Sequence, residues 1–350
     1  MVECHNKISK TGLIEKVCIL LLFLSVSFSI CYWAMAKYDV NTDYAACGDA
    51  QSYIKMSQMD YENVRKPFRY RILMPSLVYI LNKHLNLDSF LNKYYEDVEK
   101  KKIQLNFGII NILSLAFAGF LLFYYCLHLG FNKWEGLVGA FLFFTSFFVV
   151  NYYSVPMVDS MAAFFVIACF YALLKNSIPG LVLAFLFGVF AKETTFIVIP
   201  LIMLEERKIF SRKLLYCLPG IVLYSIFVNV SSYSQGWTIS NTVFNHGKLL
   251  GCIYGFIDTL NFYYIIDFIQ TFMFLWVLFF IALFKCKKPV FIKRSLWLLL
   301  LPLVMAPIAA TPSVGRVSFF LFPIVIPCAL LALRKIFTLD NTDFVSIEKG

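Results

Sequence analysis

Long apolar runs, separated by short polar segments, dominate the chain. A lipid core of about 30 Å needs roughly 20 apolar residues in a helix, and an open sheet edge is not stable in hydrocarbon. The pattern therefore predicts an all-α, polytopic integral membrane helical bundle of about ten transmembrane or half-membrane helices, forming one domain over residues 1–350. The expected helices cover 17–36, 103–127, 134–152, 155–174, 178–191, 194–204, 213–230, 262–284, 295–310 and 316–336.

The runs 178–191 and 194–204 are each too short to cross a membrane alone. They favour a half-depth hairpin whose tip, Ala191–Thr194, faces an outer cavity. A single kinked helix over the same residues is the alternative, and it would place every later loop on the opposite side of the membrane.

The composition narrows the class of protein. Hydrophobic residues make up 60% of the chain and charged residues 15%, against about 45–50% and about 25% in a soluble domain. This excludes a cytosolic enzyme, a disordered chain and a soluble nucleic-acid binder, so no nucleic acid is expected as a partner. The net charge of +10 fits Lys and Arg in loops on the cytoplasmic side of a membrane.

Positively charged residues also set the expected orientation. The first run resembles a signal peptide, but its length and the absence of a small-residue cleavage site favour an uncleaved span. With a cytoplasmic N-terminus, the inner loops and their margins hold Lys133, Lys175, Arg207, Lys208, Arg212, Lys213, Lys285, Lys287, Lys288, Lys293, Arg294, Arg334 and Lys335. We therefore expect a multi-pass membrane protein whose two termini, including a tail over 337–350, are cytoplasmic.

Two polar segments remain for the outer side, a first extracytoplasmic loop over 37–102 and a second over 231–261. Apolar residues recur at helical spacing over 72–90, as in an interfacial amphipathic helix. The cysteines contain no C-x-x-C pair, which argues against a zinc cluster or a redox motif. Cys47 and Cys252 fall in the outer segments, which leaves a disulfide between them open.

Ionisable side chains beside apolar runs are the candidates for chemistry, because charge at membrane depth is costly. Asp49 follows Gly48 at the start of a helix-compatible stretch, where a helix cap is the simpler interpretation and a catalytic carboxylate the alternative. Arg69 and Arg71 belong to a cationic cluster over 65–71 that suits either a bound phosphate or lipid head groups.

Further candidates lie at the expected outer ends of later runs. Asp159 enters a run, and a structural ion pair or a functional carboxylate accounts for it equally well. Lys192 and Glu193 occupy the hairpin tip, where they neutralise each other or hold a lipid phosphate through Lys192. Arg316 starts the last run, either snorkelling to the interface or joining the other charges. Together these residues point to an anionic substrate with a lipid tail.

These motifs resemble those of the GT-C superfamily of polytopic membrane glycosyltransferases, and are similar to its bacterial mannosyltransferase-like branch. The resemblance extends over about residues 15–335 and rests on Gly48-Asp49, Pro67–Arg71, Val158–Ser160 and Ala191–Thr194, the last followed by an apolar run that ends in Pro200. It implies a helical bundle with a large first outer loop that contains interfacial helices, placed in a bacterial inner membrane.

The resemblance also implies an activity. A sugar would pass from a polyprenyl-phosphate-linked donor to a glycan or lipid-linked acceptor on the extracytoplasmic side, in the synthesis or modification of a cell-surface glycopolymer. Asp49 takes the role of the base that acts on the acceptor hydroxyl. The substrate-binding residues are Arg69, Arg71, Lys192 and Arg316 for the donor phosphate, with Asp159 and Glu193 as further acidic groups.

The resemblance implies no cofactor, and a divalent metal stays open. Many members of the superfamily carry paired acids in the first loop. Here Asp43 and Asp49 are six positions apart, which weakens the case for a metal held by an acidic pair.

Two other functions compete with this one. An O-antigen or capsule polymerase also uses a polyprenyl-linked sugar, but typically with an Arg-rich outer loop, and the segment 231–261 offers only His246 and Lys248 as cations. A flippase or transporter of lipid-linked saccharides typically shows paired repeats and charges at the membrane midplane. The sequence has no such repeat, and its candidate charges cluster at the outer ends of the runs.

Overall fold

The computed structural model describes residues 12–37, 48–64, 67–86, 88–93, 96–153, 155–206, 211–233, 262–302 and 314–337. Over these residues the chain forms helices and no strand, so the predicted all-α class is confirmed. The cysteines Cys47 and Cys252, between which a disulfide stays open, lie outside the described residues, as do the acid Asp43, the segment 234–261 and the tail after Phe337.

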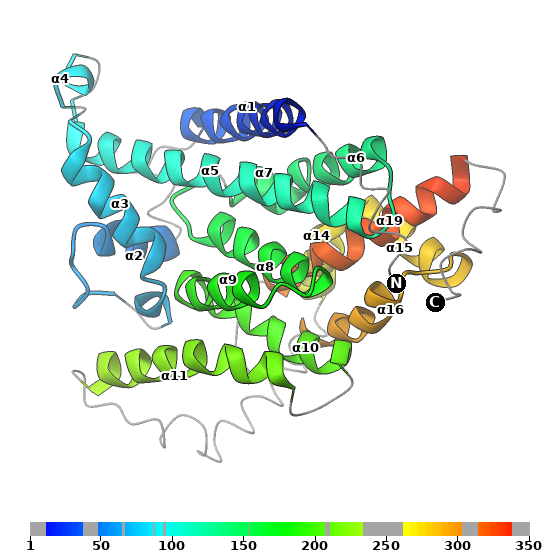
Figure 1. Cartoon of the computed structure of the whole chain (residues 1–350). Coiled ribbons are helices and arrows are strands. Elements are labelled where there is room, and N and C mark those ends of the chain that lie inside the picture. The colour runs from blue at the N-terminus through cyan, green and yellow to red at the C-terminus, as the bar shows by residue number, and fades with distance from the viewer. Residues whose placement is uncertain are drawn as a thin grey trace.

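The helices form one bundle, shown in Figure 1. Their bounds are α1 (Leu13–Lys37), α2 (Gly48–Met56), η2 (Phe68–Tyr70), α3 (Leu73–His84), α4 (Asp88–Leu91), α5 (Val98–His128), α6 (Lys133–Phe144), α7 (Phe147–Asn151), α8 (Asp159–Leu174), α9 (Ile178–Ala191), η3 (Glu193–Ile197), α10 (Val198–Glu206), α11 (Arg212–Tyr233), α14 (Phe262–Phe272), α15 (Phe274–Lys285), α16 (Val290–Ser295), η4 (Leu296–Leu300), α18 (Val314–Ser318), η5 (Phe319–Leu321) and α19 (Phe322–Phe337). Elements labelled η are 3₁₀ helices.

The predicted count of about ten spans is wrong for the described residues. Four helices are long and apolar enough to cross a membrane, namely Leu13–Met35, Val98–His128, Arg212–Ser231 and Gly315–Phe337, and α14 with α15 makes a fifth if this pair, bent by 80°, is one span. The other apolar runs do form helices, but short ones. At 1.5 Å per residue, α8 reaches about 24 Å and α9 about 21 Å. Long apolar helices of this kind are typical of a membrane-embedded protein.

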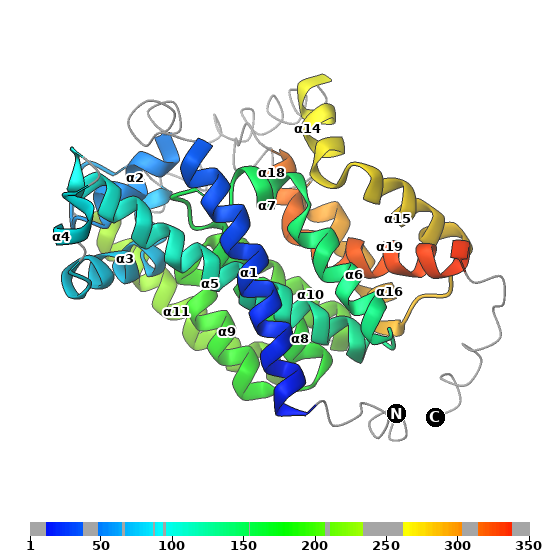
Figure 2. The ribbon, with the colours of Figure 1, turned by 90° about the horizontal axis from the view of Figure 1, so that it is seen from above.

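The long helix α5 is the centre of the bundle. It packs against α1, α6 and α8, and Figure 2 shows α1 lying across it. Close approach is possible because small residues face large ones: a Cβ on Gly119 would lie 2.5 Å from the Phe144 ring, and one on Gly108 would lie 2.8 Å from the Met35 sulfur. Since every lost contact in such an interface costs dispersion energy, these two glycines fix how closely the neighbouring helices pack.

Two tight turns reverse the chain at the same end of the bundle. Gly130, with φ +90°, ends α5, and the amide of Phe131 donates to the Cys126 carbonyl over 3.1 Å. Asn176, with φ +54°, ends α8, and the amide of Ser177 donates to the Ala172 carbonyl over 2.8 Å. Both are Schellman motifs, in which a Gly or Asn adopts the left-handed conformation that other residues avoid.

The chain also reverses between α9 and α10, as the hairpin interpretation predicts. The Lys213 ammonium donates to the Asn176 side chain, just before α9, over 2.8 Å, and pairs with Glu206, at the end of α10, over 3.2 Å. The start of α9 and the end of α10 therefore lie together. A single kinked helix over these residues would separate them, so the kinked alternative is wrong.

Ion pairs tie the helix ends together at this end of the bundle, which we call the cationic end. The pairs are Lys133–Glu15, Arg334–Glu135, Lys213–Glu206 and Arg294–Glu205. They join α1 to α6, α19 to α6, α11 to α10 and α16 to α10.

The described part of the first loop docks on the opposite end of the bundle, at the left of Figure 1. Residues of α2 and α3 form a second apolar core with α5 and the start of α8, which includes Tyr53, Met74, Phe107 and Met161. The predicted amphipathic helix over 72–90 is present as α3, followed by the short α4. This docking brings the polar residues of the loop to the first turn of α8.

Candidate functional site

The candidate site is an ion-pair network at this opposite end, and Asp159 is its buried centre. The Asp159 side chain has no exposed surface, and it receives the Lys192 ammonium at 2.5 Å on Oδ1 and the Arg316 Nη2 at 2.6 Å on Oδ2. Arg316 Nε adds a third hydrogen bond of 3.1 Å to Oδ1. A buried carboxylate is stable only when paired and hydrogen-bonded in this way.

Arg316 extends the network to the first loop. Its Nη1 donates to Asp49 Oδ2 over 2.6 Å, so one guanidinium bridges two carboxylates. In the sequence, Arg316 lies 267 residues after Asp49 and 157 residues after Asp159. The Asp49 side chain is 25% exposed, whereas Asp159 is fully covered. Asp49 is thus the carboxylate of this bridge that a ligand can reach.

Arg71 and Glu193 form the second half of the network. The Arg71 guanidinium binds Glu193 with two parallel hydrogen bonds, from Nε to Oε2 at 2.8 Å and from Nη2 to Oε1, and its Nη1 donates to the Tyr53 hydroxyl over 2.6 Å. Burial raises the pKa of Glu193, but the charge and hydrogen bonds of Arg71, with the Lys192 ammonium, together lower it by more, and the net direction is down. The Glu193 side chain keeps 35% of its surface exposed.

Lys192 and Glu193 do not neutralise each other, although they are adjacent. Lys192 ends α9 in an extended conformation, with φ −165° and ψ 141°. In extended backbone successive side chains point to opposite sides. Lys192 therefore turns inward to Asp159 and over the Phe320 ring, 5.1 Å from its centroid, while Glu193 turns to Arg71.

Helix ends position the two most buried charges. Asp159 lies in the first turn of α8 and Lys192 follows the last turn of α9. The helix dipole favours a carboxylate at the first place and an ammonium at the second. Two buried polar side chains fix the approach to α8: Asn111 donates to the Val155 carbonyl over 2.7 Å and accepts from the Ser160 hydroxyl.

Two residues that the sequence interpretation did not assign help to build the site. Tyr53 lies one helical turn after Asp49 on α2, and that spacing is the signal that could have identified it. Asp267 on α14 accepts the Gly315 amide at 2.6 Å and so holds the residue before Arg316. A Cβ on Gly315 would lie 2.4 Å from the Asp267 carbonyl oxygen, which is why a glycine precedes this arginine.

Arg69 is the one predicted cation that stands outside the network, within the described residues. It lies in η2 beside Arg71, and its Nη1 is buried with no hydrogen-bond partner among those residues. A buried guanidinium nitrogen without an acceptor is costly. Arg69 therefore has a donor to offer to a bound anion, whereas Arg71, Lys192 and Arg316 already hold carboxylates.

The network is balanced in charge, with three carboxylates and three cations in its ion pairs. Arg69 adds one positive charge beside it. No group of three or more His, Cys, Asp or Glu side chains among the described residues is arranged to hold a metal ion. The open, partly exposed members Asp49 and Glu193 suit contact with hydroxyl groups, and Arg69 suits a phosphate.

Comparisons of the chain with known protein families, with curated proteins and with solved structures found no match.

Proposed function

We propose that the protein is a membrane glycosyltransferase that moves a sugar from a polyprenyl-phosphate-linked donor to the hydroxyl of a glycan or lipid-linked acceptor on the extracytoplasmic side. The observation that carries the proposal is the Asp49–Arg316–Asp159 bridge. In this bridge Arg316 links the partly exposed Asp49 carboxylate to the buried Asp159 carboxylate. Such a bridge supports a base at a fixed place at the surface of an apolar bundle.

In the proposed reaction the acceptor oxygen attacks the anomeric carbon of the donor sugar. The bond from that carbon to the phosphate oxygen breaks, polyprenyl phosphate leaves, and Asp49 takes the proton of the acceptor hydroxyl. Negative charge grows on the departing phosphate, so a nearby cation stabilises the transition state. Arg69 is the proposed ligand of this phosphate, because its buried Nη1 has no acceptor among the described residues.

Arg69→Ala is expected to raise the KM for the donor by roughly 10- to 100-fold, since a hydrogen bond to a charged group contributes about 1.5–3 kcal/mol. Arg69→Lys is expected to restore only part of the loss, because a point charge replaces a bidentate fork. The measurement is release of polyprenyl phosphate by purified protein in lipid, supplied with a panel of polyprenyl-phosphate sugars. Arg212→Ala, an exposed arginine that starts α11, is the matched control and should have no effect.

If no donor of the panel yields transfer, the proposed function is contradicted. If transfer occurs and Arg65→Ala abolishes donor use while Arg69→Ala does not, the phosphate ligand lies elsewhere in the cluster 65–71.

The proposed function requires the network to face the extracytoplasmic side, with both termini in the cytoplasm. Reporter fusions at Lys175 and Lys288, near the cationic end, are expected to read cytoplasmic. Fusions after Cys47 and within 231–261 are expected to read extracytoplasmic. The opposite pattern would place Asp49 in the cytoplasm, where a donor presented on the outer leaflet cannot reach it.

A further inference from the structure

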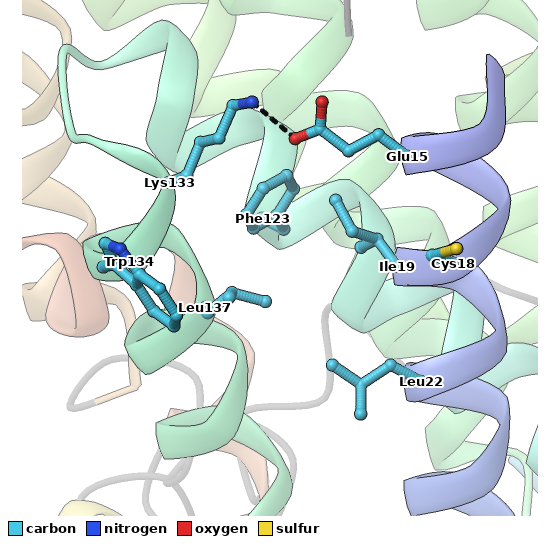
Figure 3. Close-up of a pocket in the computed structure, with 8 residues that line it drawn as sticks. All are labelled: Glu15, Cys18, Ile19, Leu22, Phe123, Lys133, Trp134 and Leu137. Carbon is cyan, nitrogen blue, oxygen red and sulfur yellow. Dashed lines mark ion pairs between the residues drawn. The ribbon is translucent and has the colours of Figure 1, made fainter. Parts of the chain in front are cut away.

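Two pockets lie at the cationic end of the bundle, far from the network. Figure 3 shows the first, between α1 and α6, where Lys133 meets Glu15 at 2.6 Å over a lining that is otherwise apolar. That pocket carries a neutral pair. The second, of about 380 Å³, is lined by Leu204, Val290, Lys293, Arg294 and Trp297, from α10, α16 and η4.

The second pocket carries an excess of positive charge. Arg294 Nη1 donates to the Glu205 carbonyl over 2.7 Å and to Glu205 Oε1 over 3.0 Å, which neutralises one cation. Lys293 is exposed and has no ion-pair partner among the described residues. One net positive charge therefore remains at the pocket.

The Arg294–Glu205 pair is also incompletely hydrogen-bonded. Arg294 Nε and Glu205 Oε2 are both buried, and neither finds a partner within the described part of the chain. Unpaired buried polar atoms of this kind are rare and costly. Glu205 does not line the pocket, so the polar groups of the lining are the Lys293 ammonium and the Arg294 guanidinium, which match an anionic group.

The rest of the lining is apolar and open. Trp297 is 67% exposed and Val290 54% exposed, and both lie within a few residues of the two cations. A tryptophan beside Lys and Arg at a helix end is typical of the boundary between hydrocarbon and head groups. A free anion would leave this apolar surface uncovered, whereas a lipid would cover it with an acyl chain.

We propose that this pocket binds one anionic phospholipid, with its phosphate at Lys293 and Arg294 and an acyl chain against Trp297 and Val290. Basic pockets between membrane helices recognise anionic head groups in this way, and each cation near the surface contributes about a fivefold gain in binding. The site is separate from the network, and the proposal does not rest on the glycosyltransferase function.

The test uses the full chain in phosphatidylcholine nanodiscs, titrated with brominated phosphatidylglycerol or brominated phosphatidylcholine, with tryptophan fluorescence as the readout. Quenching by phosphatidylglycerol is expected at a midpoint about fivefold lower than that of phosphatidylcholine, from the one net positive charge at Lys293. Trp297→Phe is expected to remove this selective quenching. Lys293→Gln is expected to raise the phosphatidylglycerol midpoint about fivefold and to leave the phosphatidylcholine midpoint unchanged.

Lys287→Gln is the matched control, because Lys287 is also exposed at the cationic end but does not line the pocket. Equal midpoints for the two lipids would overturn the proposal, as would equal effects of Lys293→Gln and Lys287→Gln. Relief of the selective quenching by millimolar inorganic phosphate would identify a site for free anions and would also overturn the lipid assignment.

Discussion

Asp49→Asn is expected to lower sugar transfer by about 10²–10⁴-fold while leaving the fold intact, because a base must be ionised to take a proton. Asparagine keeps the size of the side chain and caps a helix about as well as aspartate. The substitution removes the charge of residue 49, but Arg316 keeps its ion pair with Asp159. Since the Asp49–Arg316 pair is partly exposed, we expect a stability cost of about 0–1 kcal/mol. Transfer rate and thermal unfolding, measured on the same preparation, check both statements.

The alternative role for Asp49, as a helix cap and an ion-pair partner alone, gives a different result. It predicts near-normal transfer for Asp49→Asn and a stability loss of about 0.5–2 kcal/mol for Asp49→Ala. Asp60→Asn, in the turn that follows α2, is the matched control for removal of a carboxylate from this loop. An active Asp49→Asn enzyme would contradict the assignment of Asp49 as the base. The next candidate would be Glu193, the other partly exposed carboxylate of the network.

Asp159→Asn is expected to destabilise the protein by about 3–5 kcal/mol, because it leaves Lys192 and Arg316 without their shared buried counter-charge. The substitution preserves the shape of the side chain, so the loss reports charge and not packing. Unfolding in detergent, followed by the loss of near-ultraviolet circular dichroism against denaturant, measures it. Activity is expected to fall with it, since Arg316 also holds Asp49.

Two variants separate the buried charge from other effects. Asp97→Asn removes a solvent-accessible carboxylate that caps α5 and pairs with Lys100, and it should destabilise the protein far less than Asp159→Asn, because exposed ion pairs contribute little. Lys192→Met in the Asp159→Asn background removes one of the unpaired cations and is expected to recover part of the stability. If the double variant is as unstable as the sum of the two single variants, the ion pair is not the source of the loss.

The positions of the helices could be predicted from the apolar runs, but the number of spans could not. Hydropathy marks α8, α9 and α10 as apolar, and a helix satisfies all backbone hydrogen bonds of such a run within the segment itself. Whether each helix crosses the membrane depends on where it ends, and those ends are set by local geometry. Asn176 stops α8 with a positive φ, and Lys192 stops α9 in an extended conformation.

Which residues gather at the site could be predicted from the sequence, but not how they pair. Charges at the ends of apolar runs are expected to gather at one end of a bundle, and the structure brings Asp49, Arg71, Asp159, Lys192 and Arg316 together, with Glu193 beside them. The partners within the site could not be predicted. The pairing of Glu193 with Arg71, in place of Lys192, depends on the extended backbone at one residue and on the docking of α2 and α3.

The order of synthesis determines when the ion pairs of Arg316 can form. Arg316 leaves the ribosome 157 residues after Asp159 and 267 residues after Asp49. At a synthesis rate of about 5–20 residues per second, roughly ten seconds to a minute pass between the synthesis of the two carboxylates and that of their common partner. During that interval Lys192 is the nearest counter-charge for Asp159, and Asp49 has none from this network. A nascent chain, or one truncated before α18, therefore leaves Asp49 without its ion-pair partner in the network, and the pairing is completed only when Arg316 has been made.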